Sequence, residues 1–402
     1  MQPPKITSIF LERSGDLPLD IYTISDPCYG PDHLRRIKTL RLRESGPDGL
    51  SETFSRLSIP SPVITEVIIE VTGPAFADFP NLPLLFGDLS TIRSLSLDNL
   101  SFDKKLLLFT SLSSLSLDIP GDLLPPFFDF LNANPTLEFI SISVWGAIPT
   151  ESVGGPPIVL DNLINLHCRD VSRHLLSRLS LPHCAFIQIE DTGPPLAVSQ
   201  SLPTSTANLR CFAQIDSLNL TTTTGVTYSG QATDTHKVEF MGPGGLAVIH
   251  WIVGYDGPRE FYPGPLSLIH AKELTVTHET VLDRPRASEL DLSLLFDAMR
   301  NLEVLKLHSC PQTDCHYILP PCADNHVCPS LHTVEVVHCS GLDQWLSSLL
   351  HIAVLRRNFG FPLRRIDVHP HPNVDSPIRN YIREINEVLS DSPATDTVQC
   401  ER

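Results

Sequence analysis

Long apolar runs are missing from this sequence. No stretch approaches 18 uninterrupted apolar residues, which argues against a membrane-spanning helix, and residues Met1 to Lys5 lack the apolar run of a secretory signal. Basic residues are scarce, with 29 Lys and Arg against 46 Asp and Glu, and the resulting net charge of −17 argues against nucleic acid or an anionic membrane as a partner. We therefore expect a cytoplasmic or nuclear protein.

Catalytic motifs are missing as well. The Gly242-Pro243-Gly244-Gly245 segment has neither the Lys-Ser/Thr pair of a phosphate-binding loop nor the G-x-S-x-G elbow of a hydrolase. Serine, histidine and aspartate are common, but their spacing does not group them into a triad. We predict no catalytic residue, no cofactor and no enzymatic activity.

The ten cysteines are too few for a disulfide framework in 402 residues. Several of them, including Cys168 and Cys184, fall within apolar segments, where a reduced cysteine packs as a small hydrophobic residue. The densest group of possible metal ligands is Cys310, Cys315, His316, Cys322, His326 and Cys328. Its C-x4-C-H and C-x3-H-x-C spacings match no common zinc module, so we predict no metal site and leave zinc as the open alternative.

What the sequence does contain is a repeated apolar triplet of the form L-x-x-L-x-L. Its copies begin at Ile37, Ile64, Ile92, Leu112, Leu137, Leu163, Cys184, Ile215, Ala271, Leu302, Leu331 and Leu363. Successive copies start 20 to 32 residues apart, except for a gap of 56 residues between Ile215 and Ala271. The last two apolar residues of a triplet lie two apart and so face the same side of a strand. One such strand cannot bury its apolar side alone, so the copies are expected to stack in parallel as a solenoid.

The segments between the triplets are long enough to return the chain to the start of the next strand. Apolar residues at helical spacing predict helices over 291–300 and 341–356. A weaker pattern covers 123–131, where Pro125 and Pro126 fit only the first turn of a helix. The predicted fold class is thus an α/β solenoid, with a curved parallel sheet on the concave side and helices and irregular crossovers on the convex side.

The repeats divide the chain into segments. We predict a helix-strand entry segment over 1–33, repeats over 34–220 and a hairpin insertion over 221–265 around the glycine-rich turn. Repeats resume over 266–375. A capping helix over 376–390 begins with Ser376 and Pro377, and a disordered tail covers 391–402.

Several phrases of the sequence, taken in order, resemble one family. They are the segment Phe10 to Ile21, the Gly242 to Gly245 turn, the phrase Met299 to Leu305 and the phrase Cys328 to Leu331. Together they are similar to the leucine-rich-repeat region of fungal, mainly mushroom-type, F-box proteins. The resemblance implies a leucine-rich-repeat solenoid that serves as the substrate-recognition part of a ubiquitin-ligase adaptor. Since no F-box precedes residue 10, we expect the Skp adaptor as a partner only if an F-box is encoded upstream; the alternative is a free-standing repeat scaffold.

The triplets also fix which residues point away from the core. The expected outward residues are Thr39, Arg41, Arg43, Glu66, Ile68, Glu70, Ser94, Ser96, Asp98, Ser114, Ser116, Asp118, Phe139, Ser141, Ser143, Asn165, His167, Arg169, Phe186, Gln188, Glu190, Lys306, His308, Glu335, Arg365, Asp367 and His369. Exposed aromatic residues and arginines commonly anchor protein interfaces. We therefore predict that a protein substrate binds the concave face around Phe139, His167, Arg169 and Phe186, with Glu190 and Arg41 as further contacts; ordinary solvated strand positions are the alternative.

Overall fold

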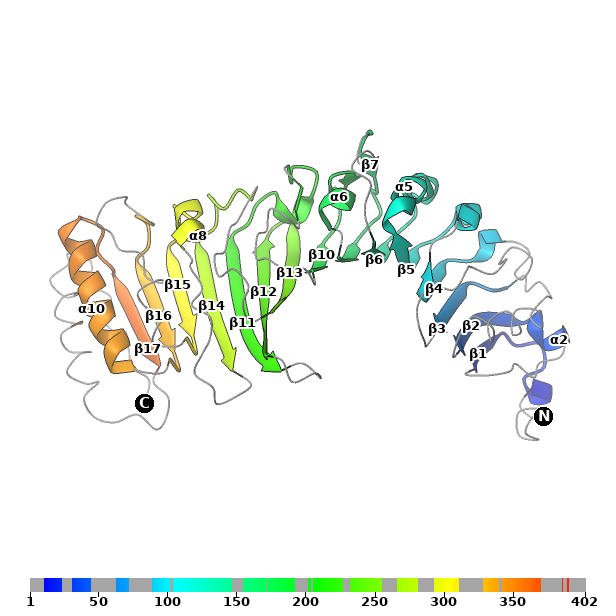
Figure 1. The fold of residues 1–402 in the computed structure, drawn as a ribbon, viewed down its shortest axis with the longest axis horizontal. Coiled ribbons are helices and arrows are strands. Elements are labelled where there is room, and N and C mark those ends of the chain that lie inside the picture. Colours follow the sequence, from blue (N-terminus) through cyan, green and yellow to red (C-terminus); the bar gives the residue numbers. More distant parts are fainter. Residues whose placement is uncertain are drawn as a thin grey trace. The chain divides into compact units, whose positions relative to one another are not determined.

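The structure, a computed structural model, describes residues 11–23, 31–44, 63–71, 89–101, 104–146, 155–170, 172–191, 202–203, 205–226, 232–254, 266–280, 293–310, 328–339, 342–369, 385 and 389. The chain forms two compact units, residues 1–184 (unit 1) and residues 185–402 (unit 2). The boundary falls within the predicted run of repeats 34–220. Both units are of the α/β class, and each carries a mostly parallel sheet that is not closed into a barrel (Figure 1).

The sheet of unit 1 has the strand order β1-β2-β3-β4-β5-β6-β8, with every neighbouring pair parallel. These strands are β1 (Leu19–Thr23), β2 (Ile37–Glu44), β3 (Glu66–Val71), β4 (Ser94–Ser101), β5 (Ser114–Pro120), β6 (Phe139–Trp145) and β8 (Asn165–Arg169). The segments between them hold α2 (Pro31–Leu34), η1 (Leu89–Thr91), η2 (Lys104–Leu108), η3 (Gly121–Leu123), α5 (Leu124–Ala133) and α6 (Ser172–Leu176). A second, two-stranded sheet pairs β7 (Ile158–Val159) with β9 (Leu179–Ser180).

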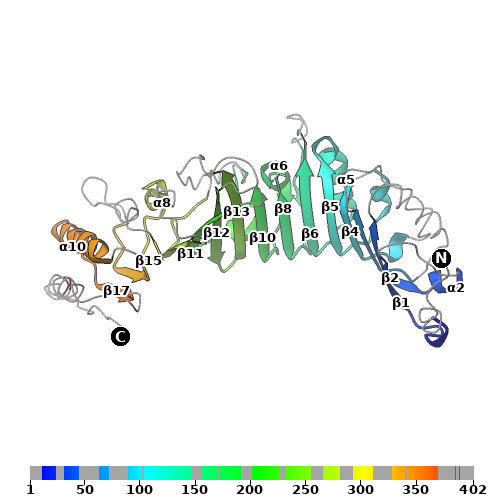
Figure 2. The ribbon, with the colours of Figure 1, turned by 60° about the horizontal axis from the view of Figure 1, so that its bottom comes forward.

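The apolar triplets account for this sheet. Along β5, for example, Leu115, Leu117 and Ile119 are buried while the residues between them are half-buried. Helices α5 and α6 lie on the same side of the sheet (Figures 1 and 2), and the buried face of α5 includes Phe127 and Phe130. The core of unit 1 therefore lies on the helical side, and the other side, which we call the outward face, carries the half-buried and exposed strand residues.

The turn before each strand repeats one hydrogen-bond pattern. In unit 1 the carbonyl of Arg93 accepts hydrogen bonds from both Ser113 and Ser114, at 2.8 and 3.0 Å. In unit 2 the carbonyl of Glu303 accepts from both His332 and Thr333 in the same way, at 3.0 and 3.1 Å. The repeat is therefore present in the backbone as well as in the apolar side chains.

The sheet of unit 2 has the strand order β10-β13-β12-β11-β14-β15-β16-β17. Its strands are β10 (Phe186–Asp191), β11 (Ser217–Val226), β12 (Ala232–Gly242), β13 (Gly245–Gly254), β14 (Glu273–Thr280), β15 (Val304–His308), β16 (Thr333–Val337) and β17 (Arg365–His369). The helical segments are η5 (Arg210–Phe212), α8 (Ser293–Ala298) and α10 (Leu342–Asn358). Strand β12 runs antiparallel to both of its neighbours, and all other neighbouring strands of this sheet are parallel to each other.

The two strands expected around the glycine-rich turn are β12 and β13, which pair from Thr233↔Gly254 to Gly242↔Gly245. They do not project from the sheet but fill two places within it, so β13 neighbours β10 and β12 neighbours β11. Strand β11 also continues to Val226, beyond the repeat boundary predicted at residue 220. Its extension consists of threonines, whose branched Cβ favours a strand, and it is paired on both sides, by β12 and by β14.

The three predicted helices are present with slightly different bounds. Helix α5 (Leu124–Ala133) was predicted over 123–131, α8 (Ser293–Ala298) over 291–300, and α10 (Leu342–Asn358) over 341–356. Pro125 and Pro126 lie in the first turn of α5, where a missing N–H does no harm. Of the segments 376–390 and 391–402, only Ile385 and Leu389 are described; both are helical and buried. Among the described residues, no helix has the length and apolar character needed to cross a membrane.

Candidate functional site

Polar side chains on the outward face of unit 1 form aligned rows. Pairing across β2 to β8 places Arg41, Ile68, Ser96, Ser116, Ser141 and His167 in one row. The next row toward the carboxyl ends of the strands contains Arg43, Glu70 and Asp98, followed by Asp118, Ser143 and Arg169. The rows arise because the triplets place equivalent outward residues at equivalent positions along neighbouring strands.

A hollow of about 260 Å³ lies over these two rows. Its lining residues are Glu70, Ser96, Leu97, Asp98, Ser116, Leu117, Asp118, Ser141, Ile142, Ser143, His167 and Arg169, and we call it the polar hollow. Strand register shifts between Leu97 and Ser101, so β4 carries an irregularity immediately beside Asp98. Such bulges re-aim side chains and are frequent next to functional sites.

The charges around the polar hollow are only partly paired. Glu70 forms ion pairs with Arg41 at 2.5 Å and with Arg43 at 3.9 Å, so its carboxylate is fully compensated by the two arginines of β2. Asp98 is exposed and has no ion pair or hydrogen bond with any described residue. Asp118 is on the neighbouring strand, where its register partner is Ser101 because of the shift after Leu97. The exposed carboxylate of Asp98 makes this part of the hollow favour a cation or a hydrogen-bond donor.

The other end of the hollow is lined by a histidine and an arginine of β8. His167 Nδ1 lies 3.2 Å from the Ser141 hydroxyl, within hydrogen-bond distance, and Arg169 on the same strand is exposed. The hollow is therefore acidic over β4 and β5, hydroxyl-lined across β5 and β6, and basic at β8. An arrangement of this kind can bind polar groups but offers no adjacent nucleophile and base.

The predicted site residues do not all lie in one unit or in the polar hollow. Phe139, His167, Arg169 and Arg41 all lie on the outward face of unit 1, and the Phe139 side chain is 38% exposed. Only His167 and Arg169 line the polar hollow. The hollow is centred nearer β4 and β5 than the site predicted from aromatic and arginine residues.

Phe186 and Glu190 belong to β10 of unit 2. Both are half-buried, and Gln188 Nε2 donates a hydrogen bond of 2.8 Å to Glu190 Oε1. The structure does not place them in the polar hollow of unit 1.

The residues that the prediction left out of its proposed centre are the serines and aspartates of β4 and β5. The sequence carried a signal for them, because Ser94 to Asp98 and Ser114 to Asp118 both read Ser-Leu-Ser-Leu-Asp. Identical outward residues in consecutive copies predict a continuous row on the surface. The prediction from exposed aromatic residues and arginines does not include this row.

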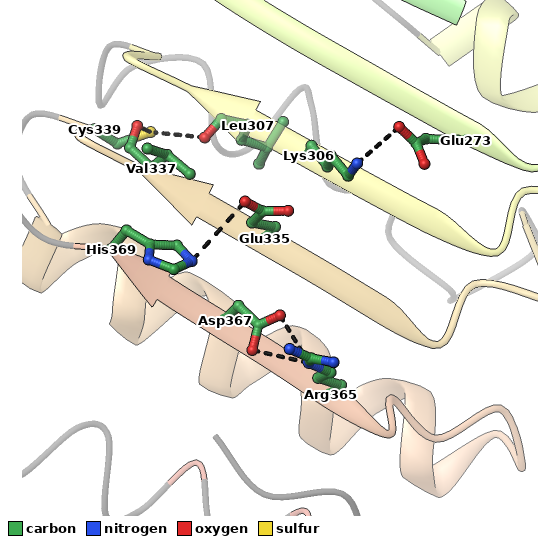
Figure 3. A network of polar contacts seen from close by, with 9 residues as sticks. All are labelled: Glu273, Lys306, Leu307, Glu335, Val337, Cys339, Arg365, Asp367 and His369. Atoms are coloured by element: carbon green, nitrogen blue, oxygen red, sulfur yellow. Dashed lines mark hydrogen bonds and ion pairs between the residues drawn. The ribbon is translucent and has the colours of Figure 1, made fainter. Parts of the chain in front are cut away.

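The corresponding face of unit 2 differs, because its charges pair with one another. Lys306 Nζ lies 2.8 Å from Glu273 Oε1, Arg365 Nε lies 2.8 Å from an Asp367 oxygen, and His369 Nε2 lies 3.9 Å from Glu335 Oε1 (Figure 3). A partner that bound these carboxylates would have to displace cations already beside them. Burial lowers the pKa of His308 in β15, against the raising effect of Glu335, so this group tends to remain neutral.

The cysteine and histidine group has a structural explanation where it is described. The thiol of Cys310 donates to the carbonyls of Val276 and His308, and the thiol of Cys328 donates to those of Phe296 and Met299. The remaining members, residues 315–326, lie outside the described residues. Within the described part of the chain, no three His, Cys, Asp or Glu side chains are grouped so that they could hold a metal ion.

The glycine-rich turn also has a packing role. A Cβ added to Gly242 would collide with the carbonyl oxygen of Gln214, and one added to Gly244 would collide with that of Arg210. Gly245 has a φ of +128° and lies against the carbonyl of Ala185. The turn between β12 and β13 therefore needs glycine because neighbouring backbone approaches it closely.

Comparison with known proteins does not assign this chain to a family: no family model matches it, and no curated protein matches it either.

Proposed function

We propose that both units are leucine-rich-repeat arrays. In that repeat the pattern L-x-x-L-x-L continues with x-x and then Asn or Cys, and this chain has Cys310 after Leu302, Leu305 and Leu307. Cys339 holds the same place after Leu331, Val334 and Val336. Each of these thiols donates to a backbone carbonyl of the preceding strand, Val276 or Leu307, as a buried polar group at this position must.

The function that this architecture supports best is protein binding through the outward face of unit 1. The polar hollow carries this proposal: a parallel sheet whose other side is covered by helices leaves five neighbouring strands, β3 to β6 and β8, with a recessed row of hydroxyls and carboxylates. A purely structural surface has no need for two consecutive Ser-Leu-Ser-Leu-Asp strands. The partner group that fits Asp98 and the serine row is a lysine or arginine side chain, because it provides several N–H donors and a compensating charge.

The resemblance to F-box proteins extends this proposal to a biological role. On that basis the chain holds the substrate of a ubiquitin ligase, and the Skp adaptor is a partner only if an F-box is encoded upstream. If the chain acts instead as a free-standing scaffold, its partner is bound but not degraded. The sequence resemblance is the support for the ubiquitin role, and the polar hollow supports binding in either case.

The binding test compares two variants of equal charge change. Asp98→Lys reverses a charge in the polar hollow, whereas Asp129→Lys reverses one on the exposed side of α5, across the sheet from the hollow. Partners captured by the tagged full chain would be identified by mass spectrometry, and their affinities measured for each variant. We expect Asp98→Lys to weaken binding about tenfold or more while Asp129→Lys leaves it unchanged.

Equal binding by both variants would refute the polar hollow as the site. The ubiquitin role is examined separately, by following the lifetime of the captured partner after the gene is deleted. A longer lifetime supports a ligase adaptor, and an unchanged lifetime supports the scaffold.

A further inference from the structure

Two cysteines of unit 2 hold the same position on neighbouring strands. His308 at the end of β15 pairs with Val337 at the end of β16, and Ser309 N donates a 2.8 Å hydrogen bond to Val337 O, which prolongs the pairing. Cys310 follows Ser309 directly, and Cys339 lies two residues after Val337. The two cysteines are therefore side by side in register.

The same backbone bend precedes each cysteine. Ser309 has a φ of 54° and His338 a φ of 52°, both in the left-handed region that few residues other than glycine adopt. The bend turns both of the following side chains into the core, so Cys310 is 1% exposed and Cys339 is 5% exposed. Both cysteines are in the reduced thiol form.

The separation of the two strands suits a disulfide. Neighbouring strands lie about 4.8 Å apart, and disulfides join Cα atoms about 4.4–6.8 Å apart. The Cys339 sulfur leans toward β15, because its thiol donates to the carbonyl of Leu307 at 3.5 Å (Figure 3). It therefore lies on the side of β16 that faces β15, whereas the Cys310 thiol donates to the Val276 carbonyl of β14 and has to turn about its Cα–Cβ bond to meet Cys339.

The two thiols also interact directly. A hydrogen bond from the Cys310 thiol lowers the pKa of Cys339, helped by backbone hydrogen bonds and opposed by burial. Cys168 in unit 1 shows the contrasting case, since burial without such help raises its pKa to about 12. Cys339 therefore forms the reactive thiolate more readily than a buried thiol without such hydrogen bonds, such as Cys168.

We propose that Cys310 and Cys339 are a modification site, at which a peroxide converts the two thiols into a disulfide between β15 and β16. The Cys339 thiolate attacks one oxygen of hydrogen peroxide, the O–O bond breaks, and the departing hydroxide takes up a proton to become water. Cys310 then attacks the resulting sulfenic sulfur, forming the S–S bond and breaking the S–O bond. The second hydroxide leaves with the Cys310 proton as water, so two thiols lose two electrons and one peroxide gains them.

The disulfide would fasten two strands of unit 2 without touching the polar hollow of unit 1. Because both sulfurs are buried, the reaction needs a brief opening at the ends of β15 and β16, and it should be slower than oxidation of an exposed thiol. A dithiol reagent would reverse it. This inference is independent of the proposed partner-binding face.

The test treats the reduced full-length protein with hydrogen peroxide, blocks remaining thiols and maps the peptides by mass spectrometry without reduction. We expect a peptide pair joining Cys310 to Cys339, which dithiothreitol removes, with Cys168 and Cys328 still reduced. In Cys310→Ser the oxidation should stop at Cys339, and a sulfenic-acid reagent such as dimedone should label that residue.

Three results would overturn the proposal. They are thiols at both positions that remain fully reduced, a mixture of pairings in which 310–339 is no more frequent than others, or equal yields from native and urea-unfolded protein. The last comparison uses no variant, so the test does not depend on whether a cysteine substitution disturbs the core.

Discussion

Replacing Asn134 with alanine would remove the polar link between two turns of unit 1. Asn134 is fully buried just after α5, and its Nδ2 donates to the carbonyls of Phe109 at 2.7 Å and Phe130 at 3.0 Å. Its Oδ1 accepts a 3.2 Å hydrogen bond from the backbone N–H of Leu112, the first residue of the triplet that precedes α5. Asn134→Ala leaves all three backbone groups buried without this partner.

The size of the effect follows from these three contacts. A buried hydrogen bond contributes about 1 kcal/mol net, and an unsatisfied buried group costs about 1–3 kcal/mol, so the variant should lose about 3 kcal/mol or more. At a urea dependence of about 2 kcal/mol per molar, the unfolding midpoint would fall by about 1.5 M. Far-ultraviolet circular dichroism during urea titration measures this shift.

Two further variants separate the possible causes. Asn132→Ala changes an exposed residue of the same helix and should shift the midpoint little. Asn134→Asp keeps the shape and the acceptor for Leu112 but provides no N–H for the two carbonyls, so it should remain strongly destabilised at neutral pH. The reasoning is refuted if Asn134→Ala costs less than about 1 kcal/mol, or no more than Asn132→Ala.

Two other predictions concern unit 2. Gly244→Ala should lower the free energy of unfolding by about 1–3 kcal/mol, because the new Cβ meets the Arg210 carbonyl. Urea titration measures this effect, with Ala213→Gly at an exposed site just after η5 as the control variant. An unchanged unfolding midpoint in Gly244→Ala would contradict the close approach. Burial lowers the pKa of His308 below its ordinary value of 6.5. The stability that the neutral His308 contributes should therefore be fully present above pH 6.5 and should decline as the pH falls below it, because the unfolded chain binds a proton first. Urea midpoints measured from pH 5 to pH 7.5 should show a shallower decline in His308→Gln, and identical profiles would exclude the effect.

Much of the strand and helix pattern could be predicted because burial alternates with the sequence. Leu115 and Leu117, two apart, specified both the strand β5 and the side that enters the core, and Pro125 and Pro126 specified where α5 begins. These features depend on residues close in the chain. Local periodicity of apolar residues is sufficient to encode them.

The order of strands in unit 2 could not be predicted in this way. Alternation fixes which side of β12 and β13 is buried but says nothing about which strand each one pairs with. The extension of β11 through its threonines was missed for a related reason, since no apolar period continues beyond Leu220. For the candidate site, the outward register was predictable, but the depth of the polar hollow depends on how five strands are placed together.

The hairpin has a consequence for how the two halves of the chain can change in evolution. From β1 to β6 each strand is followed in the sheet by the next one along the chain, so a whole repeat can be gained or lost while the flanking strands still meet in the same direction. In unit 2, β10 is bonded to β13 and β14 to β11, with the reversed strand β12 between them. Deleting β13 alone would place the reversed β12 beside β10, whereas losing β12 and β13 together would leave β10 beside β11, which run in the same direction. The two strands of the hairpin are therefore expected to be gained or lost as a pair.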